Sequence, residues 1–591
     1  MSSAASINSF ESPCAASSLV DVGARALIEG RARQVSGLRA GLLSGQKVTG
    51  LALPVRSLQT GSKQKADALY RGIFKFAGEQ FVRTEDNIFS EKSLGTGWQK
   101  QLHGFAWLAD MQASGRELSR VQARALVLDW IDSKNPTGFS HHSGQAYKSD
   151  VIARRVISWV NYSDFLLKGG PETFANRFYS SVRRQTGWLY RRTFTEKNRL
   201  KRLQAAIALV YSVVGFEGLE GLRSKAFERL AHELERQILP DGGHISRNPQ
   251  VLRDLLADLV PIRQTLEKAR MEVPVAINAA LERMMPALRF FTYDDGGLAV
   301  FNGVNDTSAG LVRRILETDD VCGRPIRHAS HSGYVRLQQG NSTIMIDTGK
   351  PTLPSINNRA TAGVLAFEFC DGGARLVTNC GAIQNSDEAW SSAARTTQAH
   401  SSLCIDDQPI GKILEGSILQ RTFGGAVVLS APNVSAHTQT VQQGAMFTGS
   451  HDGYLKSHGI IHERQLFLNN SGHDLRGLDS FIMDQENLIS DRSVPFAVRF
   501  HLHPSVRATI SQDGASAMLL LANKTGWRFS ARGGQLKLED SVYLPENGRV
   551  RKTYQLVVRG FVGNTGKVMW AFKRIEKRKG IKSKSDAPQL L

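Results

Sequence analysis

The chain has 591 residues, more than the roughly 250–300 residues that one hydrophobic core accommodates, so two large domains or three smaller ones are expected. Hydrophobic residues make up 41% and charged residues 22% of the chain, proportions that fit a folded globular protein and exclude wholesale disorder. The formal net charge of +20 predicts attraction for polyanions, but it does not choose among nucleic acid, anionic membrane and acidic polysaccharide.

Apolar segments and cysteines limit the cellular context. No segment approaches the roughly 18 consecutive apolar residues that span a bilayer. The first twenty residues lack the basic and apolar regions of a signal peptide, so the residues alone indicate the cytoplasm. The cysteines are odd in number and form no Cys-x-x-Cys pair, which favours buried free thiols over a disulfide framework. They are Cys14, Cys322, Cys370, Cys380 and Cys404.

Residues 1–60 are rich in Ser and Ala and are predicted to form a partly disordered N-terminal extension. Helical periodicity dominates residues 61–290. It is clearest at Leu203, Ile207, Val210 and Val214, and again at Phe227, Leu230, Ala231, Leu234 and Ile238. Further helices are expected near 66–82, 100–113, 116–132, 149–167, 172–192 and 250–270. Many helices with short connections predict a helical bundle or toroid.

Apolar residues alternate along residues 291–575, which predicts strands. The alternating sets are Leu365, Phe367 and Phe369; Val498, Phe500 and Leu502; and Tyr554, Leu556 and Val558. Turn sequences such as Asp513-Gly514 separate the sets, so we expect an antiparallel β-sandwich. Helices first and strands afterwards indicate two segregated domains. Residues 576–591 are predicted to be a basic disordered tail.

The densest basic run lies between residues 181 and 202 and contains few acids. Its guanidinium groups could pair with carboxylates or sulfates, and its aromatic rings could contact sugar rings. The candidate binding residues are Arg184, Trp188, Tyr190, Arg191 and Arg192. A solvated, salt-bridged helix face is the alternative interpretation of this run.

Histidines offer weaker candidates for a site. His501 and His503 project to one side of a predicted strand with Arg499, where a polar sheet face is favoured over a metal site. His400 precedes another strand, where an ordinary loop histidine is the alternative. The chain contains no phosphate loop, no Gly-x-Ser-x-Gly elbow and no His-Glu-x-x-His, which removes three common enzyme classes.

Several segments in a fixed order together resemble the heparinase II/III-like family, especially its bacterial branch. They are residues 102–108, 154–159, 239–249, 296–303, 333–337, 367–369, 399–403, 451–454, 474–477 and 499–504. The resemblance covers roughly residues 65–575. It implies an incomplete (α/α) toroid over residues 61–290 and an antiparallel β-sandwich over residues 291–575, which together hold an acidic polysaccharide. It also implies the cell envelope or periplasm, with the cytoplasm as the alternative.

The resemblance further implies β-elimination at uronic acid residues. Neutralising the uronate carboxylate stabilises the enolate-like intermediate, a Tyr or His removes the C5 proton, and an acid protonates the leaving oxygen. Asn198 matches the family's neutralising Asn, and Arg199 replaces the His that follows it. The family's Tyr after Pro249 is absent.

Three positions bear on a metal. The family's His in Ala-His-Ala falls at Thr361, its Asp falls at Asn379, and its remaining His matches His400. One intact ligand of three predicts no bound metal and no cofactor.

We therefore expect a polysaccharide lyase in which Asn198 and Arg199 neutralise the carboxylate, and His400, His244 or Tyr454 acts as base. The alternative is a catalytically impaired protein that binds the polysaccharide without cutting it. A nucleic-acid-binding protein is a third hypothesis, supported only by charge and the basic tail. No membrane span is predicted, and the oligomeric state stays open.

Overall fold

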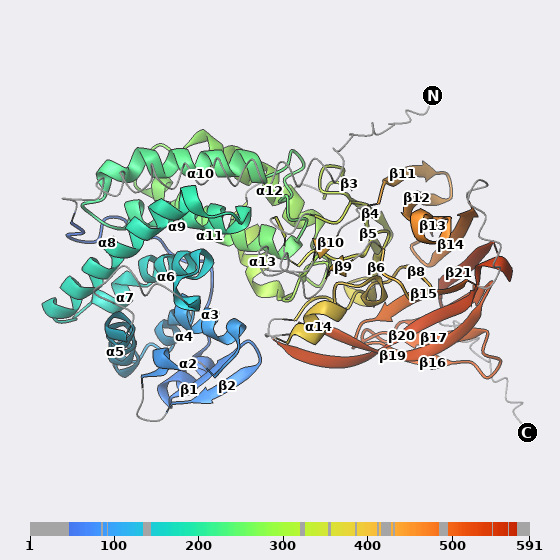
Figure 1. The fold of residues 1–591 in the computed structure, drawn as a ribbon, viewed down its shortest axis with the longest axis horizontal. Helices are drawn as coiled ribbons and strands as arrows, with labels where there is room; N and C mark the ends of the chain where they lie inside the picture. The colour runs from blue at the N-terminus through green and yellow to red at the C-terminus, as the bar shows by residue number, and fades with distance from the viewer. Residues whose placement is uncertain are drawn as a thin grey trace, which may run out of the picture.

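The computed structural model describes residues 47–575 except 84–86, 92, 134–143, 320–324, 353–355, 358, 384–386, 411–412, 415–426, 429–431, 484–493, 547 and 565. Most of the predicted extension, the predicted tail, Cys14 and Cys322 lie outside these residues. Helices gather at one end of the molecule and two large sheets at the other (Figure 1). The predicted order of a helical part followed by antiparallel sheets is therefore confirmed.

The helical part contains α2 to α13 and one small hairpin. The helices are α2 Lys63–Tyr70, α3 Thr96–Gly104, α4 Leu108–Ala113, α5 Glu117–Ser133, α6 Ser149–Asn161, α7 Ser163–Leu167, α8 Glu172–Thr195, α9 Arg199–Gly215, α10 Arg223–Gln237, α11 Pro249–Lys268, α12 Val275–Phe290 and α13 Ala309–Leu316. None of the described helices is long and apolar enough to cross a membrane.

The prediction of a helix over 66–82 is wrong beyond Tyr70. Strands β1 Ile73–Phe76 and β2 Glu79–Val82 form a hairpin there. Its two turn residues, Ala77 and Gly78, have φ angles of 49° and 83°, the left-handed values that a tight two-residue hairpin turn requires. The aromatic and β-branched residues on either side favour strand over helix.

Helix α9 is the centre of the helical part. From Ala205 to Gly215 every residue is buried, because α6, α8, α10 and α11 surround it. This segment contains no charged residue, as expected for a helix enclosed on all sides. Its start, in contrast, carries Arg199, Lys201 and Arg202, so the charged end of a buried helix emerges at one edge of the helical core.

The second half forms two antiparallel sheets. One has eight strands in the order β11-β12-β13-β14-β21-β18-β17-β16, and the other follows β19-β20-β15-β7-β6-β5-β4-β3 with β8 paired to β15. The strands are β3 His328–Ala329, β4 Tyr334–Gln339, β5 Ser342–Asp347, β6 Phe367–Asp371, β7 Ala374–Thr378, β8 Leu403–Ile405, β11 Val434–Val441, β12 Gly444–Tyr454, β13 Ile460–Asn469, β14 Asp474–Met483, β15 Pro495–Leu502, β16 Arg507–Ile510, β17 Ser516–Leu520, β18 Gly526–Arg532, β19 Gln535–Glu546, β20 Arg549–Phe561 and β21 Lys567–Arg574. Short β9 Ile413–Leu414 pairs with β10 Val427–Val428.

The core between the sheets is aromatic. Phe367 of one sheet stacks on Trp570 of the other with ring centroids 5.4 Å apart, and Phe500 lies 4.8 Å from the same ring. Val498 and Leu502 face this core, as the alternation predicts, whereas Tyr554 is 48% exposed and is not part of it. Cys370, Cys380 and Cys404 are buried free thiols, as predicted.

A buried polar chain crosses this core. The backbone N–H of Gly453 donates to Nδ1 of His451 (3.1 Å), so His451 donates from Nε2 to Nδ1 of His462 (3.1 Å). His462 then donates from Nε2 to Asp479 (2.7 Å), which also accepts from Nε of Arg464 (2.7 Å). Arg464 in turn donates to backbone oxygens of the facing sheet. The chain thus ties the two sheets together with neutral imidazoles.

One arginine joins the helical part to the sandwich. Arg247, in the loop between α10 and α11, donates to the backbone oxygens of Ser332 (2.7 Å), Gly333 (3.1 Å) and Lys350 (2.9 Å). It also forms an ion pair with Asp347 in which both side chains are less than a tenth exposed. Three backbone acceptors and a carboxylate satisfy the guanidinium as its burial requires.

Tyr334 completes this interdomain clamp. Its hydroxyl donates to the backbone oxygen of Arg247 (2.6 Å), and its ring lies 4.9 Å from the guanidinium carbon. Asn302 donates to the Tyr334 hydroxyl (2.6 Å) and to Asp347 (3.0 Å). Asp241 accepts from both the backbone and the hydroxyl of Ser332. The orientation of the two halves is therefore set by buried, mutually bonded groups.

Asp347→Asn will lower the free energy of unfolding by about 3–5 kcal/mol, because it leaves a buried guanidinium without its counter-charge. Urea unfolding followed by intrinsic fluorescence measures the change. Glu546→Gln is the control, since Glu546 pairs with Arg551 at an exposed site where loss of the pair costs at most about 1 kcal/mol. Equal, small effects of both substitutions would contradict this account of the clamp.

Stability will fall as the pH drops below about 6.5. Burial lowers the pKa of both His451 and His462, so the unfolded chain takes up protons there that the folded chain does not. Their contribution is fully present above the unfolded pKa and is lost towards the folded pKa, by up to about 1.4 kcal/mol per pH unit for each imidazole. Urea midpoints at pH 7.5, 6.5 and 5.5 test this; a flat profile would refute it.

Candidate functional site

Asn198 and Arg199 lie where α9 begins. The side-chain oxygen of Asn198 caps the helix by accepting from the backbone N–H of Lys201 (3.1 Å). The backbone N–H of Asn198 donates to the Glu196 carboxylate (3.1 Å). The backbone oxygen of Arg199 accepts from Gln237 (2.9 Å). The capping role explains the Asn at position 198 and holds the charged start of α9 in place.

His244 is bonded to the same network. It is 2% exposed, and its Nδ1 accepts from the backbone N–H of Ser246 (3.0 Å), so Nε2 carries the proton and donates to Gln237 (3.1 Å). Gln237 therefore connects His244 to the backbone of Arg199. Burial lowers the pKa of His244 to about 3. Both ring nitrogens are occupied, so this imidazole positions other groups and is a poor base.

Basic side chains from two helices and one sandwich segment lie around Asp150, which belongs to a third helix. Lys100 of α3 and Lys201 of α9 pair with Asp150 of α6 at 3.1 and 3.5 Å. Although burial acts to raise it, these two lysines hold the pKa of Asp150 below its ordinary value. We call the group Lys100, Asp150, Asn198, Lys201 and Arg359 the junction.

Arg359 brings the sandwich side to the junction. Its side chain is exposed, yet enough protein surrounds it that desolvation lowers its pKa, while the nearby Asp150 and Asp254 act to raise it. Asn357, two residues earlier, donates to the backbone oxygens of Ser246 (3.0 Å) and Asn302 (3.2 Å). The Arg359 segment is thereby fixed to the His244 loop, which in turn is fixed to the start of α9.

His400 lies on the sandwich side under residues 360–363. Its Nδ1 donates to the backbone oxygen of Thr396 (2.8 Å), which leaves the lone pair on Nε2. A Cβ at Gly363 would lie 2.5 Å from the His400 ring, so only glycine fits there. The imidazole is 3% exposed, and burial lowers its pKa to about 4.

Of the two residues that the resemblance places at metal-ligand positions, Asn379 forms hydrogen bonds to backbone groups and Thr361 does not. Asn379 donates to the backbone oxygen of Val300 (3.0 Å) and accepts from the backbone N–H of Ser401 (2.9 Å). Thr361 is buried with its hydroxyl unpaired. Among the described residues no group of three or more His, Cys, Asp or Glu side chains could hold a metal ion. Neither an amide nor a hydroxyl supplies the carboxylate and second imidazole that zinc requires.

Tyr454 lies inside the sandwich and is 1% exposed. Its hydroxyl reaches the backbone oxygens of Leu403 (3.4 Å) and Gln408 (3.3 Å), and burial raises its pKa well above the ordinary value. A phenol that must ionise in this environment is disfavoured as a base. The structure connects His244 to the start of α9 by hydrogen bonds and shows no such connection for Tyr454.

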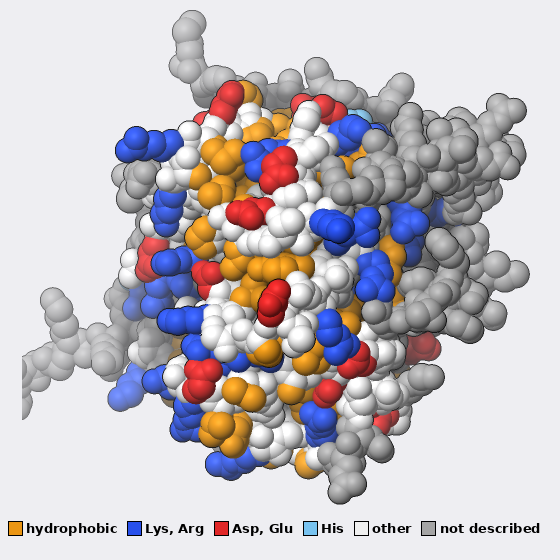
Figure 2. All heavy atoms as spheres, turned by 90° about the vertical axis from the view of Figure 1, so that its left-hand side faces the viewer, with side chains coloured by type: hydrophobic (Ala, Val, Ile, Leu, Met, Phe, Trp, Pro, Cys, Tyr) orange, Lys and Arg blue, Asp and Glu red, His pale blue; other side chains and the backbone are white. Residues whose placement is uncertain are grey.

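The first part of the basic run lies on α8, and its end lies at the start of α9. Arg184 and Arg191 are exposed and Arg192 is half-buried, but Tyr190 is buried against Phe194. Trp188 packs edge-on against Tyr147 with centroids 5.5 Å apart. The aromatic rings are therefore used in helix packing. Figure 2, which faces the helical end of the molecule, shows Lys and Arg in separate groups with hydrophobic and uncharged side chains between them.

The two sandwich histidines form no metal pair. His501 reaches Gln398 (2.9 Å) and Ser541 (2.7 Å) through its two ring nitrogens, whereas His503 bonds Ser505 (2.8 Å). Each ring thus has its own local partners, as in an ordinary polar sheet face.

Lys100, Asp150 and Arg359 were not predicted from the sequence. Each lies in a separate segment, and none carries a motif. The signal that could have pointed to Lys100 was its place two residues before the first segment of the family resemblance, on the helix that begins at Thr96. Nothing local marks Arg359.

Comparison with known proteins identifies the family. Residues 322–578 match the family model described as heparinase II/III-like, C-terminal. The chain is 30% identical over 483 residues to FtsZ-localized protein C of Caulobacter vibrioides (strain NA1000 / CB15N), covering 80% of this chain and 81% of that protein.

Solved structures show the same fold. Heparinase III superposes with a TM-score of 0.69 at 14% identity, over 90% of this chain and 89% of that one. A mutant of the heparan sulfate lyase HepC from Pedobacter heparinus superposes with a TM-score of 0.57 at 15% identity, over 88% and 83%. The chain therefore belongs to the heparinase II/III-like family, and its toroid and β-sandwich have the fold of polysaccharide lyases.

Proposed function

We propose that this protein binds an acidic polysaccharide at the junction and does not cleave it. The observation that carries the proposal is a division between two sets of groups. Side chains that attract a carboxylate are accessible at the junction, whereas each candidate base is buried.

Three cationic groups and a helix start can receive a sugar carboxylate. Lys100 and Lys201 share one acid, Asp150, and Arg359 approaches from the sandwich. Asn198 uses its side-chain oxygen as the helix cap, so its amide N–H groups are the part that can donate to a ligand. The backbone N–H groups and dipole of α9 favour an anion in the same place. Together they provide the carboxylate neutralisation that binding of a uronate requires.

Proton abstraction lacks an equivalent group. A base needs a free lone pair within hydrogen-bond reach of the substrate and a pKa near the working pH. His244 has both nitrogens bonded and a pKa of about 3, and the Tyr454 phenol is buried. His400 alone keeps a lone pair, but its pKa is about 4. Arg199, in the place of the family's His, stays protonated and cannot accept a proton.

The combined variant Lys201→Gln and Arg359→Gln will bind a uronate polymer at least about tenfold more weakly, because a charge-assisted hydrogen bond contributes about 1.5–3 kcal/mol. Titration calorimetry with polygalacturonate and heparin at fixed salt measures the affinity. Lys75→Gln with Arg549→Gln removes the same charge from exposed sites on β1 and β20 and is the control. Equal losses in both variants would show non-specific attraction only.

The second candidate function is a lyase that uses His400 as its base. Of the two candidate histidines, only His400 retains an unbonded ring-nitrogen lone pair. No rise in absorbance from an unsaturated uronate product is expected when polygalacturonate, heparin or the producing cell's own exopolysaccharide is incubated with the protein. Turnover that His400→Gln abolishes without loss of polymer binding would replace the binding proposal with a divergent lyase.

A third proposal concerns location and follows from the 30% identity to FtsZ-localized protein C. We propose that this chain also localises with FtsZ, in place of the envelope location that the family resemblance implies. A fluorescent fusion will form a band coincident with labelled FtsZ and will disperse when FtsZ is depleted. A fusion that is uniform along the envelope in dividing cells would contradict this localisation proposal. The proposal of polysaccharide binding would be unaffected.

A further inference from the structure

The outer face of the eight-stranded sheet, which points away from the sandwich core, is strongly basic on one side. Along β16, β17, β18 and β21 residues alternate between core and solvent. The exposed basic residues are Arg507, Arg528, Arg532, Lys567 and Lys573. No Asp or Glu occurs on these four strands. Adjacent strands lie about 4.8 Å apart, so these cations form a dense array on a flat surface.

Apolar side chains lie among these cations. Met518, Leu520 and Met569 are each 44–45% exposed. Met518 pairs with Arg528 across β17 and β18, and Arg532 pairs with Met569 across β18 and β21. The face therefore offers both charge and apolar contact, which is unlike a purely solvated sheet face.

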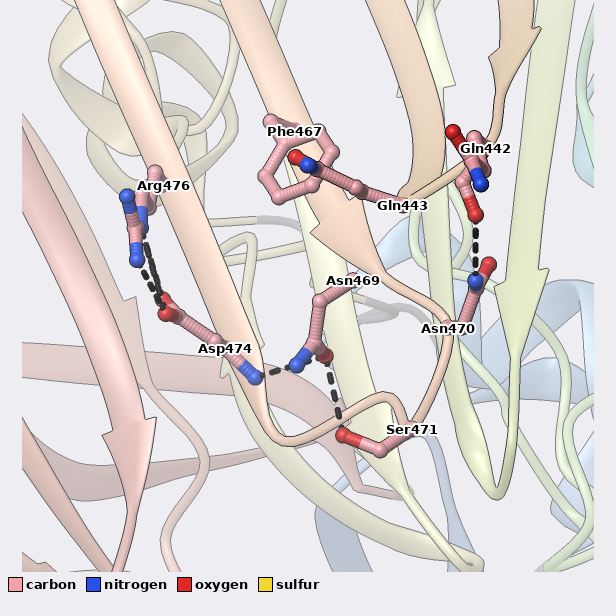
Figure 3. Close-up of a pocket in the computed structure, with 8 residues that line it drawn as sticks. All are labelled: Gln442, Gln443, Phe467, Asn469, Asn470, Ser471, Asp474 and Arg476. Carbon is pink, nitrogen blue, oxygen red and sulfur yellow. Dashed lines mark hydrogen bonds and ion pairs between the residues drawn. The ribbon is translucent and has the colours of Figure 1, made fainter.

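A pocket of about 600 Å³ opens on the same sheet, at the turns that join β11 to β12 and β13 to β14. Its lining residues are Gln442, Gln443, Phe467, Asn469, Asn470, Ser471, Asp474 and Arg476. Figure 3 shows the Phe467 ring beside the Gln443 amide, with Asp474 and Arg476 on the neighbouring strand. Amide groups and one aromatic ring dominate this pocket.

The pocket has the chemistry of a sugar site. An aromatic face packs against the apolar side of a sugar ring, and amides both donate to and accept from hydroxyl groups. Asp474 fixes Arg476 by accepting from Nε and Nη2 (2.7 Å to Nη2), so the guanidinium is held on the residue opposite Phe467, and its Nη1 takes no part in this ion pair. A pre-set guanidinium is suited to a carboxylate or a sulfate.

Strand register connects the pocket to the basic array. Asp474 is opposite Lys573, and Lys573 is opposite Arg528, so these residues form a row across β14, β21 and β18. From β13, which carries Phe467, to β18, which carries Arg528, the face spans three strand spacings, or about 14 Å. That span exceeds one sugar ring and requires an oligomer.

We propose that this row is a second binding site for an acidic polysaccharide, in which one sugar occupies the pocket and the chain crosses the strands over Lys573 and Arg528. This second site takes its class of ligand from the proposed function, but it is made of residues that do not belong to the junction. A sugar ligand fits better than an acidic peptide, because peptides add to strand edges and this pocket opens on a face. A second site would hold a long polymer on the protein while another segment occupies the junction.

The test uses the full chain with polygalacturonate and heparin as long polymers and with a short oligomer of each. The outer-face variant is Lys573→Glu with Arg528→Glu, and Phe467→Ala probes the pocket. Lys75→Glu with Arg549→Glu is the matched control. Circular dichroism and the thermal midpoint confirm folding, and Lys573→Gln with Arg528→Gln supplies a milder version if the reversed charges disturb the sheet.

The variant Lys573→Glu with Arg528→Glu and the variant Phe467→Ala are each expected to weaken long-polymer binding at least tenfold. Both are expected to leave short-oligomer binding at the junction unchanged. Unchanged long-polymer affinity in folded outer-face variants would overturn this site while leaving the junction proposal standing. Loss of binding only in outer-face variants, with no effect of Lys201→Gln and Arg359→Gln, would overturn the junction proposal and leave the outer-face site standing. Tighter binding of polyglutamate or single-stranded DNA than of either uronate polymer, lost in the same variants, would assign the face to another polyanion and overturn the proposal.

Discussion

The contact between Arg247 and Asp347 is the constraint on which the arrangement of the molecule depends. It fixes a loop of the helical part against the first strands of the sandwich through a buried ion pair and three backbone acceptors. Arg247 has a φ of 58°, a left-handed conformation that costs a non-glycine residue about 1–3 kcal/mol, so its surroundings must hold it there. Because His244 and Asn248 flank this residue, the clamp also sets the position of the loop that contacts the start of α9.

The burial that stabilises the fold also lowers the basicity of the candidate catalytic histidines. A buried imidazole is neutral and is held by specific partners, which suits structure and lowers its pKa far below the range useful to a general base. His244 and His400 both meet this description. Asn379 and Thr361 stand where a metal-binding relative has charged or imidazole ligands, and Asn379 bonds to backbone groups instead. The family fold is thus retained, while the candidate bases His244 and His400 are buried and have lowered pKa values.

The positive charge of the chain is distributed and has more than one consequence. At the junction it is partly balanced by Asp150, so the group is selective in geometry as well as charged. On the outer face the cations of β18 and β21 have no acidic neighbours on their own strands and are spread over a flat surface. The first arrangement suits one carboxylate, and the second suits a polymer with repeated charge.

The sequence by itself determined the class of fold. The uncharged run of α9 and the alternation along β15 predict burial because apolar periodicity depends only on neighbouring residues. The sequence alone also indicates the family's order of motifs, with Asn198 kept and the expected Tyr and His absent. Tertiary structure alone decided that Trp188 and Tyr190 pack inward, and that Lys100, Lys201 and Arg359 lie around Asp150. These outcomes depend on contacts between residues far apart in the chain, and no local pattern encodes which distant side chains will share a site.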